Sequence, residues 1–210
     1  EKLKIDISNM LFDTIQEIVT INKNSNDYKN FEFDLITNFS TTSPISEEDF
    51  NSMDDSEIIE SLYRNLSDYY ETKKENNKEL AFPVIRNVYE NKGNNYKRIV
   101  VPFTDGAKVI NISTDLKESF ESKCKTLIDD FEKNISLAII DDKWKVHLKK
   151  MDELKQSVQL AVHEQKDPLL IYKFEAYELF KNMIVELNKE LLSFLFKGSL
   201  PNNENNIKEA

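Results

Sequence analysis

The side chains that could bind a metal or act as nucleophiles are few and far apart. The chain has two histidines, His147 and His163, sixteen residues apart, and one cysteine, Cys124. A helical zinc site needs a second histidine about one turn away, and neither histidine has one. His147 is therefore expected to be a surface or packing residue. Cys124 has no partner for an intramolecular disulfide, which is typical of a reducing cytosol.

The carboxylates and glycines do not form an active-site pattern either. Acidic residues often come in adjacent pairs, such as Asp129-Asp130 and Asp141-Asp142. Neighbours along a helix do not face each other, so these pairs are expected on solvated helix faces rather than in an acid–base site. The three glycines are scattered, and no G-x-x-x-x-G-K-S/T motif is present to cradle a triphosphate. We therefore expect no catalytic, cofactor-binding or metal-binding residues in this chain.

Two apolar stripes predict a long helical hairpin in the C-terminal half. Apolar residues recur there at three- and four-residue steps: Leu148, Met151, Leu154 and Val158, then Leu169, Tyr172, Ala176, Leu179 and Met183. Between the stripes, Asp167 is a natural N-cap, and Pro168 suits the first helical position because its missing N–H is not needed there. The stripes are expected to close on each other as antiparallel helices, joined by a polar tip at residues 161–167.

Several unusual motifs in this region follow one another in a fixed order. They are WKVHL at 144–148, MDELKQSV at 151–158, QKDP at 165–168 and YKFEA at 172–176. With these motifs the chain resembles the two-helix finger of SecA, the ATP-driven motor of bacterial protein export. The resemblance implies a mainly α fold, in which a long helical scaffold carries an antiparallel two-helix finger and a small α/β wing domain.

The resemblance also gives the tip of the hairpin a role. Val162, His163, Glu164 and Gln165 align with the fingertip, which in the family enters the cytoplasmic mouth of the SecY channel and contacts the moving polypeptide. Most members have an aromatic residue, usually tyrosine, where this chain has His163. Taken alone, His163 would be an ordinary exposed loop histidine, so the contact is implied by the resemblance only. The imidazole is flat and amphipathic, and it can hydrogen-bond without requiring a particular sequence.

For the whole protein, the resemblance implies ATP and Mg as cofactors, bound by domains outside this chain. The implied partners are the SecYEG channel, an unfolded preprotein, and the nucleotide-binding and preprotein-binding domains of the same protein. A homodimer is an assembly that the resemblance allows. The implied location is cytoplasmic, peripheral on the cytoplasmic face of the inner membrane. The chain opens without Met and in the middle of an amphipathic pattern, so it is expected to be part of a longer protein.

The composition is typical of a helical protein whose main partner is neither nucleic acid nor an anionic lipid surface. The formal net charge is −10, whereas both of those partners favour Lys and Arg. Hydrophobic residues make up 40% of the chain, enough for a core. No apolar run approaches the roughly 20 residues of a membrane-spanning helix. With only three glycines and five prolines, long helices are expected.

The chain is expected to divide into four segments. Residues 1–24 are apolar on one face and form the distal part of the scaffold helix, and residues 25–115 form the helical wing, with a β-hairpin at about 97–113. Residues 116–198 form the finger, and residues 199–210, rich in Asn and Glu, start a disordered linker. Roughly forty residues before Asp129 look inserted relative to the common SecA pattern.

Local signals give sharper predictions inside these segments. A helix is expected over about 55–78, after which Pro83 should break or kink the path of the chain. In the β-hairpin, Pro102 cannot donate a ladder hydrogen bond, so its strand is expected at an edge or with a bulge. No glycine or proline interrupts the helical pattern from Leu116 to Val158, which predicts one unbroken rod.

Two other classes of function compete with a motor fragment. A stand-alone helical adaptor would bind a partner protein through its hairpin and its apolar C-terminal face. A freestanding enzyme is disfavoured because the chain lacks nucleophile, metal and phosphate-binding patterns. The length of the natural reading frame separates the first two, because a phosphate-binding loop several hundred residues upstream belongs to the motor and not to the adaptor.

Overall fold

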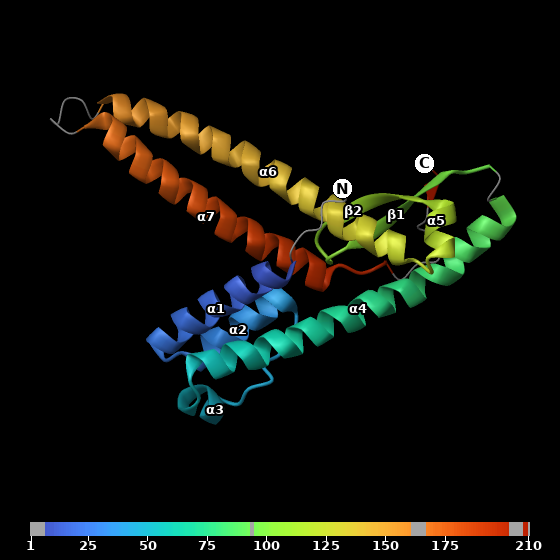
Figure 1. Ribbon diagram of the computed structural model, residues 1–210, viewed down its shortest axis with the longest axis horizontal. Helices are drawn as coiled ribbons and strands as arrows, with labels where there is room; N and C mark the ends of the chain where they lie inside the picture. Colours follow the sequence, from blue (N-terminus) through green and yellow to red (C-terminus); the bar gives the residue numbers. More distant parts are fainter. Residues whose placement is uncertain (1–6, 93–94, 161–166, 202–207, 210) are drawn as a thin grey trace.

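The computed structural model describes residues 7–92, 95–160, 167–201 and 208–209. Its helices and strands are α1 (Ile7–Ser25), α2 (Tyr28–Phe39), α3 (Glu47–Ser52), α4 (Asp55–Lys92), β1 (Arg98–Thr104), β2 (Val109–Asp115), α5 (Leu116–Glu121), α6 (Lys125–Leu160), α7 (Pro168–Lys197) and β3 (Lys208–Glu209). The fold is mainly α with a small antiparallel sheet, as the sequence predicts. Figure 1 shows α6 and α7 side by side, projecting away from the other helices. Within the described ranges, no helix is both long and apolar enough to cross a membrane.

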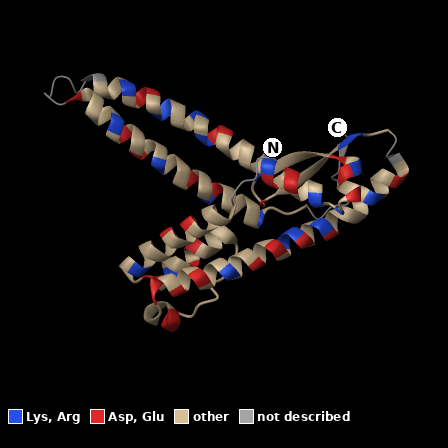
Figure 2. Cartoon of the chain, viewed as in Figure 1, with Lys and Arg blue, Asp and Glu red and all other residues tan. Residues whose placement is uncertain are grey.

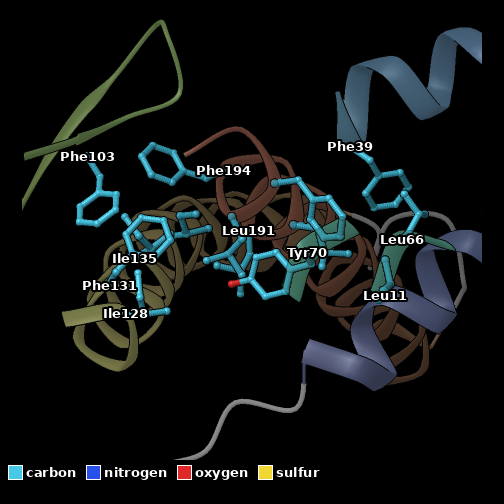
Figure 3. Packing of buried hydrophobic residues seen from close by; sticks show 14 of the residues in the cluster. Leu11, Phe39, Leu66, Tyr70, Phe103, Ile128, Phe131, Ile135, Leu191 and Phe194 are labelled. Carbon is cyan, nitrogen blue, oxygen red and sulfur yellow. The ribbon is translucent and has the colours of Figure 1, made fainter. Parts of the chain in front are cut away.

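The hydrophobic core surrounds the C-terminal end of α7. Phe196 is fully buried there between Phe39 of α2 and Tyr70 of α4, with ring centroids 5.0 and 5.1 Å away. Figure 3 shows Leu191 and Phe194 of the same helix among side chains from the rest of the cluster. The apolar face at the C-terminal end of α7 is therefore covered by α1, α2 and α4.

The three-stranded sheet packs on α6. β1 is the central strand in the order β2-β1-β3, and it pairs with β2 around a turn where Gly106 has a φ of +94°. Only glycine takes that angle readily, so the Asp-Gly turn forms as the sequence predicts. Phe103 of β1 and Phe131 of α6 stack with ring centroids 4.2 Å apart. This contact anchors the ribbon, which would be only marginally stable alone.

Pro102 does not lie on a free edge strand, as the sequence led us to expect, because β1 has neighbours on both sides. Away from β2, Thr104 exchanges two hydrogen bonds of 2.9 Å with Ser199, and β3 pairs with Ile99 and Val100. Alternate residues of a strand direct their peptide groups to the same side. The missing N–H of Pro102 therefore points away from β2, between these two contacts. Since Lys208–Glu209 form a strand, that part of the tail is not the disordered linker that was expected.

Helix α4 continues through Pro83 for 38 residues, so the predicted end near residue 78 and the predicted break are wrong. Proline removes the hydrogen bond to the carbonyl four residues earlier, here that of Glu79. Pro83 and Glu79 are both exposed, so water can satisfy that carbonyl. Ala81 and Ile85 are buried on the opposite side, and their packing holds the two halves of the helix together.

The unbroken rod predicted from Leu116 to Val158 is also wrong, because the chain turns between α5 and α6. Lys123 and Cys124 have φ angles of 51° and 65°, a left-handed conformation that is uncommon for such residues. The Cys124 amide donates to the Ser119 carbonyl at 2.7 Å and closes the end of α5. The turn lets α5 pack on α4, where Phe120 stacks on another aromatic ring, while α6 runs along the sheet.

Candidate functional site

The hairpin of α6 and α7 is the part of the molecule that extends furthest from the core. Asp167 begins α7 as its N-cap and accepts a hydrogen bond from the Leu169 amide at 2.9 Å, and Pro168 occupies the first turn. The tip residues singled out in the sequence, Val162, His163, Glu164 and Gln165, lie outside the described residues. The hairpin is therefore defined here by its two arms and by the cap at the start of the second arm.

We divide the hairpin into two parts. The root comprises residues 125–143 of α6 and 183–197 of α7, and the outer half comprises residues 144–160 and 168–182. The root carries most of the buried apolar side chains: Leu127, Ile128, Phe131, Ile135, Ile139, Met183, Leu191, Leu192, Phe194, Leu195 and Phe196. In the outer half, Leu154 and Val158 are the buried hydrophobic side chains among the described residues.

The contact between the two arms follows the predicted seam at Leu154, Val158 and Met183, but departs from it nearer the start of each stripe. Leu148 was expected in the seam but is 48% exposed, and its neighbour His147 is only 7% exposed. Leu169, expected at the start of the second stripe, is exposed as well. Apolar residues lie on several sides of α6, so the hydrophobic pattern alone could not identify the side that faces α7.

His147 packs among aromatic rings. Of the two roles predicted for it, a surface residue or a packing residue, it has the second. Its ring centroid lies 5.5 Å from that of Trp144 and 5.9 Å from that of Phe180 on α7. Its Nδ1 atom is buried and has no hydrogen-bond partner among the described residues. Burying an unpaired polar atom is unfavourable, so this nitrogen offsets part of the stability that the packing of the ring provides.

Charged side chains tie the root to the neighbouring elements. Glu190 of α7 accepts from Lys143 of α6 at 2.9 Å and from Lys108, beside the turn of the sheet, at 3.0 Å. The hydrogen bond from Lys143 is the main reason why the pKa of the Glu190 carboxyl lies below its ordinary value. Burial alone would lower the pKa of Lys143, but its hydrogen bonds to Glu190 and Glu186 outweigh burial and raise it. This cluster could not be predicted from the sequence, because its members are far apart along the chain.

The same end of α7 is tied to the first two helices. Lys189 pairs with Glu17 of α1 at 2.8 Å, and Lys197 donates to the Thr37 carbonyl of α2 at 2.6 Å. Gly198 ends the helix against Phe131, where an added Cβ would lie 2.8 Å from the ring and 2.8 Å from the Phe194 carbonyl. The C-terminal end of α7 is therefore attached to α1 and α2 as well as to α6.

The outer half exposes large apolar side chains on both arms. On α6, Leu137, Ile140, Trp144 and Leu148 recur at three- and four-residue steps and are all exposed, so they form a stripe that begins in the root. On α7, Phe174 and Tyr177 are 66% and 63% exposed. Figure 2 shows that charges of both signs are interspersed along the two arms. Exposed apolar patches of this kind are typical of a surface that another protein covers.

The described residues offer little for chemistry. They contain no group of histidine, cysteine or acidic side chains placed to hold a metal ion. Burial raises the pKa of the Cys124 thiol to about 11, so the thiolate needed for nucleophilic attack is scarce at neutral pH. What the arrangement supports is contact with other polypeptides along a projecting hairpin.

Comparison with known proteins identifies the family. The family described as SecA Wing and Scaffold domain matches residues 1–199. The chain belongs to the SecA family. The resemblance seen in the motifs of the hairpin is thereby confirmed, and it extends through the sheet and the preceding helices.

Relatives named Protein translocase subunit SecA match all or nearly all of the chain. The one from Flavobacterium psychrophilum is 60% identical over 210 residues, which cover 100% of this chain and 19% of the relative. The one from Christiangramia forsetii is 56% identical over 201 residues, covering 96% of this chain and 18% of the relative. The chain thus spans about a fifth of the length of these SecA proteins.

Proposed function

We propose that this chain is the scaffold, wing and two-helix finger of a SecA motor that moves unfolded preproteins through the SecYEG channel. The observation that carries the proposal is a long hairpin, fixed at its root and exposed at its outer half, in a chain whose relatives are named as translocase subunits. A projecting element that is anchored at one end suits a mechanical role. ATP and Mg would bind in domains that lie outside this chain.

The proposal assigns a part to each segment. Residues 1–24 are the distal scaffold helix, residues 25–115 the wing with its β-hairpin, and residues 116–198 the finger. α1 contacts both α4 and α7, so it can pass movement between the wing and the finger. The finger in turn displaces the polypeptide at the channel mouth, a conformational rather than a catalytic step.

The tip of the hairpin is the proposed point of contact with the polypeptide. Val162, His163, Glu164 and Gln165 occupy it in the sequence, and Asp167 and Pro168 start the second arm behind them. The imidazole of His163 is flat and can form hydrogen bonds, so it can act as a smaller counterpart of tyrosine. Contact of this kind does not depend on the sequence that passes.

The partners follow from the same proposal. The exposed apolar side chains of the arms, such as Trp144 and Phe174, would be covered by SecY or by the nucleotide-binding and preprotein-binding domains of the same protein. The protein would work in the cytoplasm, peripherally on the inner membrane. A stand-alone adaptor remains the second candidate, favoured by the same exposed side chains. A natural reading frame of about this length would support it and overturn the motor.

Translocation by the full-length protein tests the role of the tip. Preprotein uptake into SecYEG vesicles should be impaired by His163→Ala and retained by His163→Tyr, because only the second keeps a flat, hydrogen-bonding ring. Gln156→Ala, on the exposed side of α6, is the matched control and should transport normally. All three should keep the parent melting temperature, since surface changes are usually within about 0.5 kcal/mol. Normal transport by His163→Ala would show that the ring has no part in moving the chain.

A further inference from the structure

Helix α4 contacts the rest of the molecule near both ends and at its middle. Its N-terminal part packs on α1, where Tyr63 and Phe12 have ring centroids 6.0 Å apart, and its C-terminal part packs on α5, where Phe82 stacks on Phe120. Between these contacts, Tyr70 touches the root of the hairpin. Figure 1 shows α4 extending from α2 and α3 at one end to α5 at the other. A rotation of the hairpin root against α4 must therefore change the middle contact.

The middle contact is a hydrogen bond between side chains of α4 and α6. The Tyr70 hydroxyl, whose oxygen is red in Figure 3, donates to Glu132 Oε1 at 2.9 Å. The Tyr70 ring also stacks on Phe196 of α7 with centroids 5.1 Å apart, so one side chain of α4 touches both arms of the hairpin. Tyr70 is 6% exposed and the Glu132 side chain 23%. The contact thus holds a carboxyl group at the edge of the hydrophobic core.

Lys74 makes this contact easy to open. Its Nζ lies 3.9 Å from Glu132 Oε1 and is also paired with Glu71, one turn earlier on α4. When α6 moves away from α4, Lys74 keeps Glu71 as its partner, and Glu132, which is already partly exposed, becomes hydrated. Opening therefore leaves no charge both buried and unpaired, which is the main cost of breaking a buried ion pair.

The charge of Glu132 weakens the closed contact. Burial raises the pKa of its carboxyl group above the ordinary value, and burial outweighs the Tyr70 hydrogen bond and Lys74, which both lower the pKa. Asp129 of α6 and Glu71 of α4 raise the pKa further. The folded protein thus binds this proton more tightly than the unfolded chain does, so ionisation of Glu132 lowers the stability of the folded state. A neutral acceptor at this position would hold α4 and α6 together more firmly.

We propose that Glu132 is a positioning residue that holds α6 against α4 through Tyr70 and releases it when the finger moves against the wing. The inference rests on the proposed function in preprotein transport, because it assigns the release to the working cycle of the motor. A carboxylate suits this role better than an apolar side chain, since it makes the closed contact specific without making it strong. Proteins that must move often sacrifice stability in this way.

Urea denaturation of the intact 210-residue chain tests the effect of the charge. Glu132→Gln keeps an acceptor for Tyr70 and removes the charge, so its urea midpoint at pH 8 should be higher than that of the parent. The two midpoints should approach each other as the pH falls through the raised folded-state pKa of Glu132, because protonation then stabilises the parent. Glu79→Gln, on the exposed side of α4, is the matched control and should follow the parent at every pH.

Removing the donor should have the opposite effect on stability. Tyr70→Phe keeps the ring that stacks on Phe196 but leaves Glu132 without its hydrogen bond. The equilibrium constant of unfolding should rise by about tenfold, which corresponds to one hydrogen bond to a charged group.

Translocation into SecYEG vesicles by the full-length protein tests the release. Glu132→Gln should transport preprotein several times more slowly than the parent, although it is more stable, because the contact no longer opens readily. Tyr70→Phe should transport at least as fast as the parent, although it is less stable. A purely structural role predicts the reverse order, in which transport follows stability. Glu79→Gln should transport normally.

The outcomes separate this inference from the proposed function. A urea midpoint for Glu132→Gln that is no higher than that of the parent would overturn the inference. Parental transport by a stabilised Glu132→Gln would also overturn it, and the motor function would stand, because His163→Ala tests that function separately. A full-length parent that moves no preprotein would overturn the proposed function and this inference together, whatever the urea midpoints.

Discussion

The two parts of the hairpin are built from the same two helices but are stabilised in different ways. At the root, Phe131 packs on the sheet and on α7, and Glu190 joins α6 and α7 to the turn of the sheet. In the outer half, Leu154 and Val158 are buried between the arms, and large side chains such as Phe174 are exposed. A shallow groove remains between the arms there, lined by Leu154 and Phe174 among others.

The difference shows that helix length and helix support are separate properties. α6 and α7 are continuous across both parts, so the backbone hydrogen bonds do not change from one to the other. What changes is tertiary packing, which supplies most of the stability of helices in proteins. The outer half is therefore expected to open locally at a lower free energy than the root.

Truncating an aromatic residue in each part should give the largest contrast. Phe131→Ala removes a ring that packs on Phe103 and Phe194, and should lower the free energy of unfolding by about 3–5 kcal/mol. Phe174→Ala removes an exposed ring, and should change it by less than about 0.5 kcal/mol. Urea denaturation of the two variants measures both values. Similar losses would mean that the outer half is covered in solution as well as the root.

Replacing the buried histidine should stabilise the outer half and so reduce its difference from the root. His147→Leu removes a buried nitrogen that lacks a partner among the described residues, and should stabilise the hairpin by about 1 kcal/mol. Amide hydrogen exchange should slow in the outer half and stay unchanged in the root. Leu148→Ala, at the exposed neighbouring position, is the control and should be nearly neutral. A lower melting temperature for His147→Leu would mean that a bound water or another group satisfies the imidazole.

Removing the charge of Glu190 should give the smallest effect, confined to the root. Its side chain is 37% exposed, so Glu190→Gln should lower the free energy of unfolding by no more than about 1 kcal/mol, and less at high salt. Because the folded-state pKa of Glu190 lies below the ordinary carboxyl value of about 4.3, its stabilisation is present above that value and is lost as the pH falls through the folded-state pKa.

Urea denaturation between pH 3 and 7 checks this dependence. The parent should lose more stability than Glu190→Gln as the pH falls. Glu178→Gln, on the exposed side of the outer half, should follow the parent. Identical pH profiles for the parent and Glu190→Gln would show that the cluster around Lys143 does not hold in solution.

Much of this contrast could be foreseen from the sequence, and the remainder depends on contacts between distant residues. The hairpin and its start at Asp167 follow from stripe spacing and capping, and the sheet follows from the turn at Gly106. The turn before α6 could not be foreseen, because Lys123 and Cys124 adopt left-handed angles without glycine. The continuation of α4 through Pro83 depends on packing against α5 and α6, which local helix propensity does not include.

The attachments of α7 give the hairpin the geometry of a lever that is clamped at one end and free at the other. From Lys143 to the end of α6 the arm is about 25 Å long, at about 1.5 Å per residue. A rotation of about ten degrees at the clamp would therefore swing the far end by roughly 4 Å, close to the rise of one residue in an extended chain. A change too small to disturb the core could thus be magnified to the step size of a polypeptide.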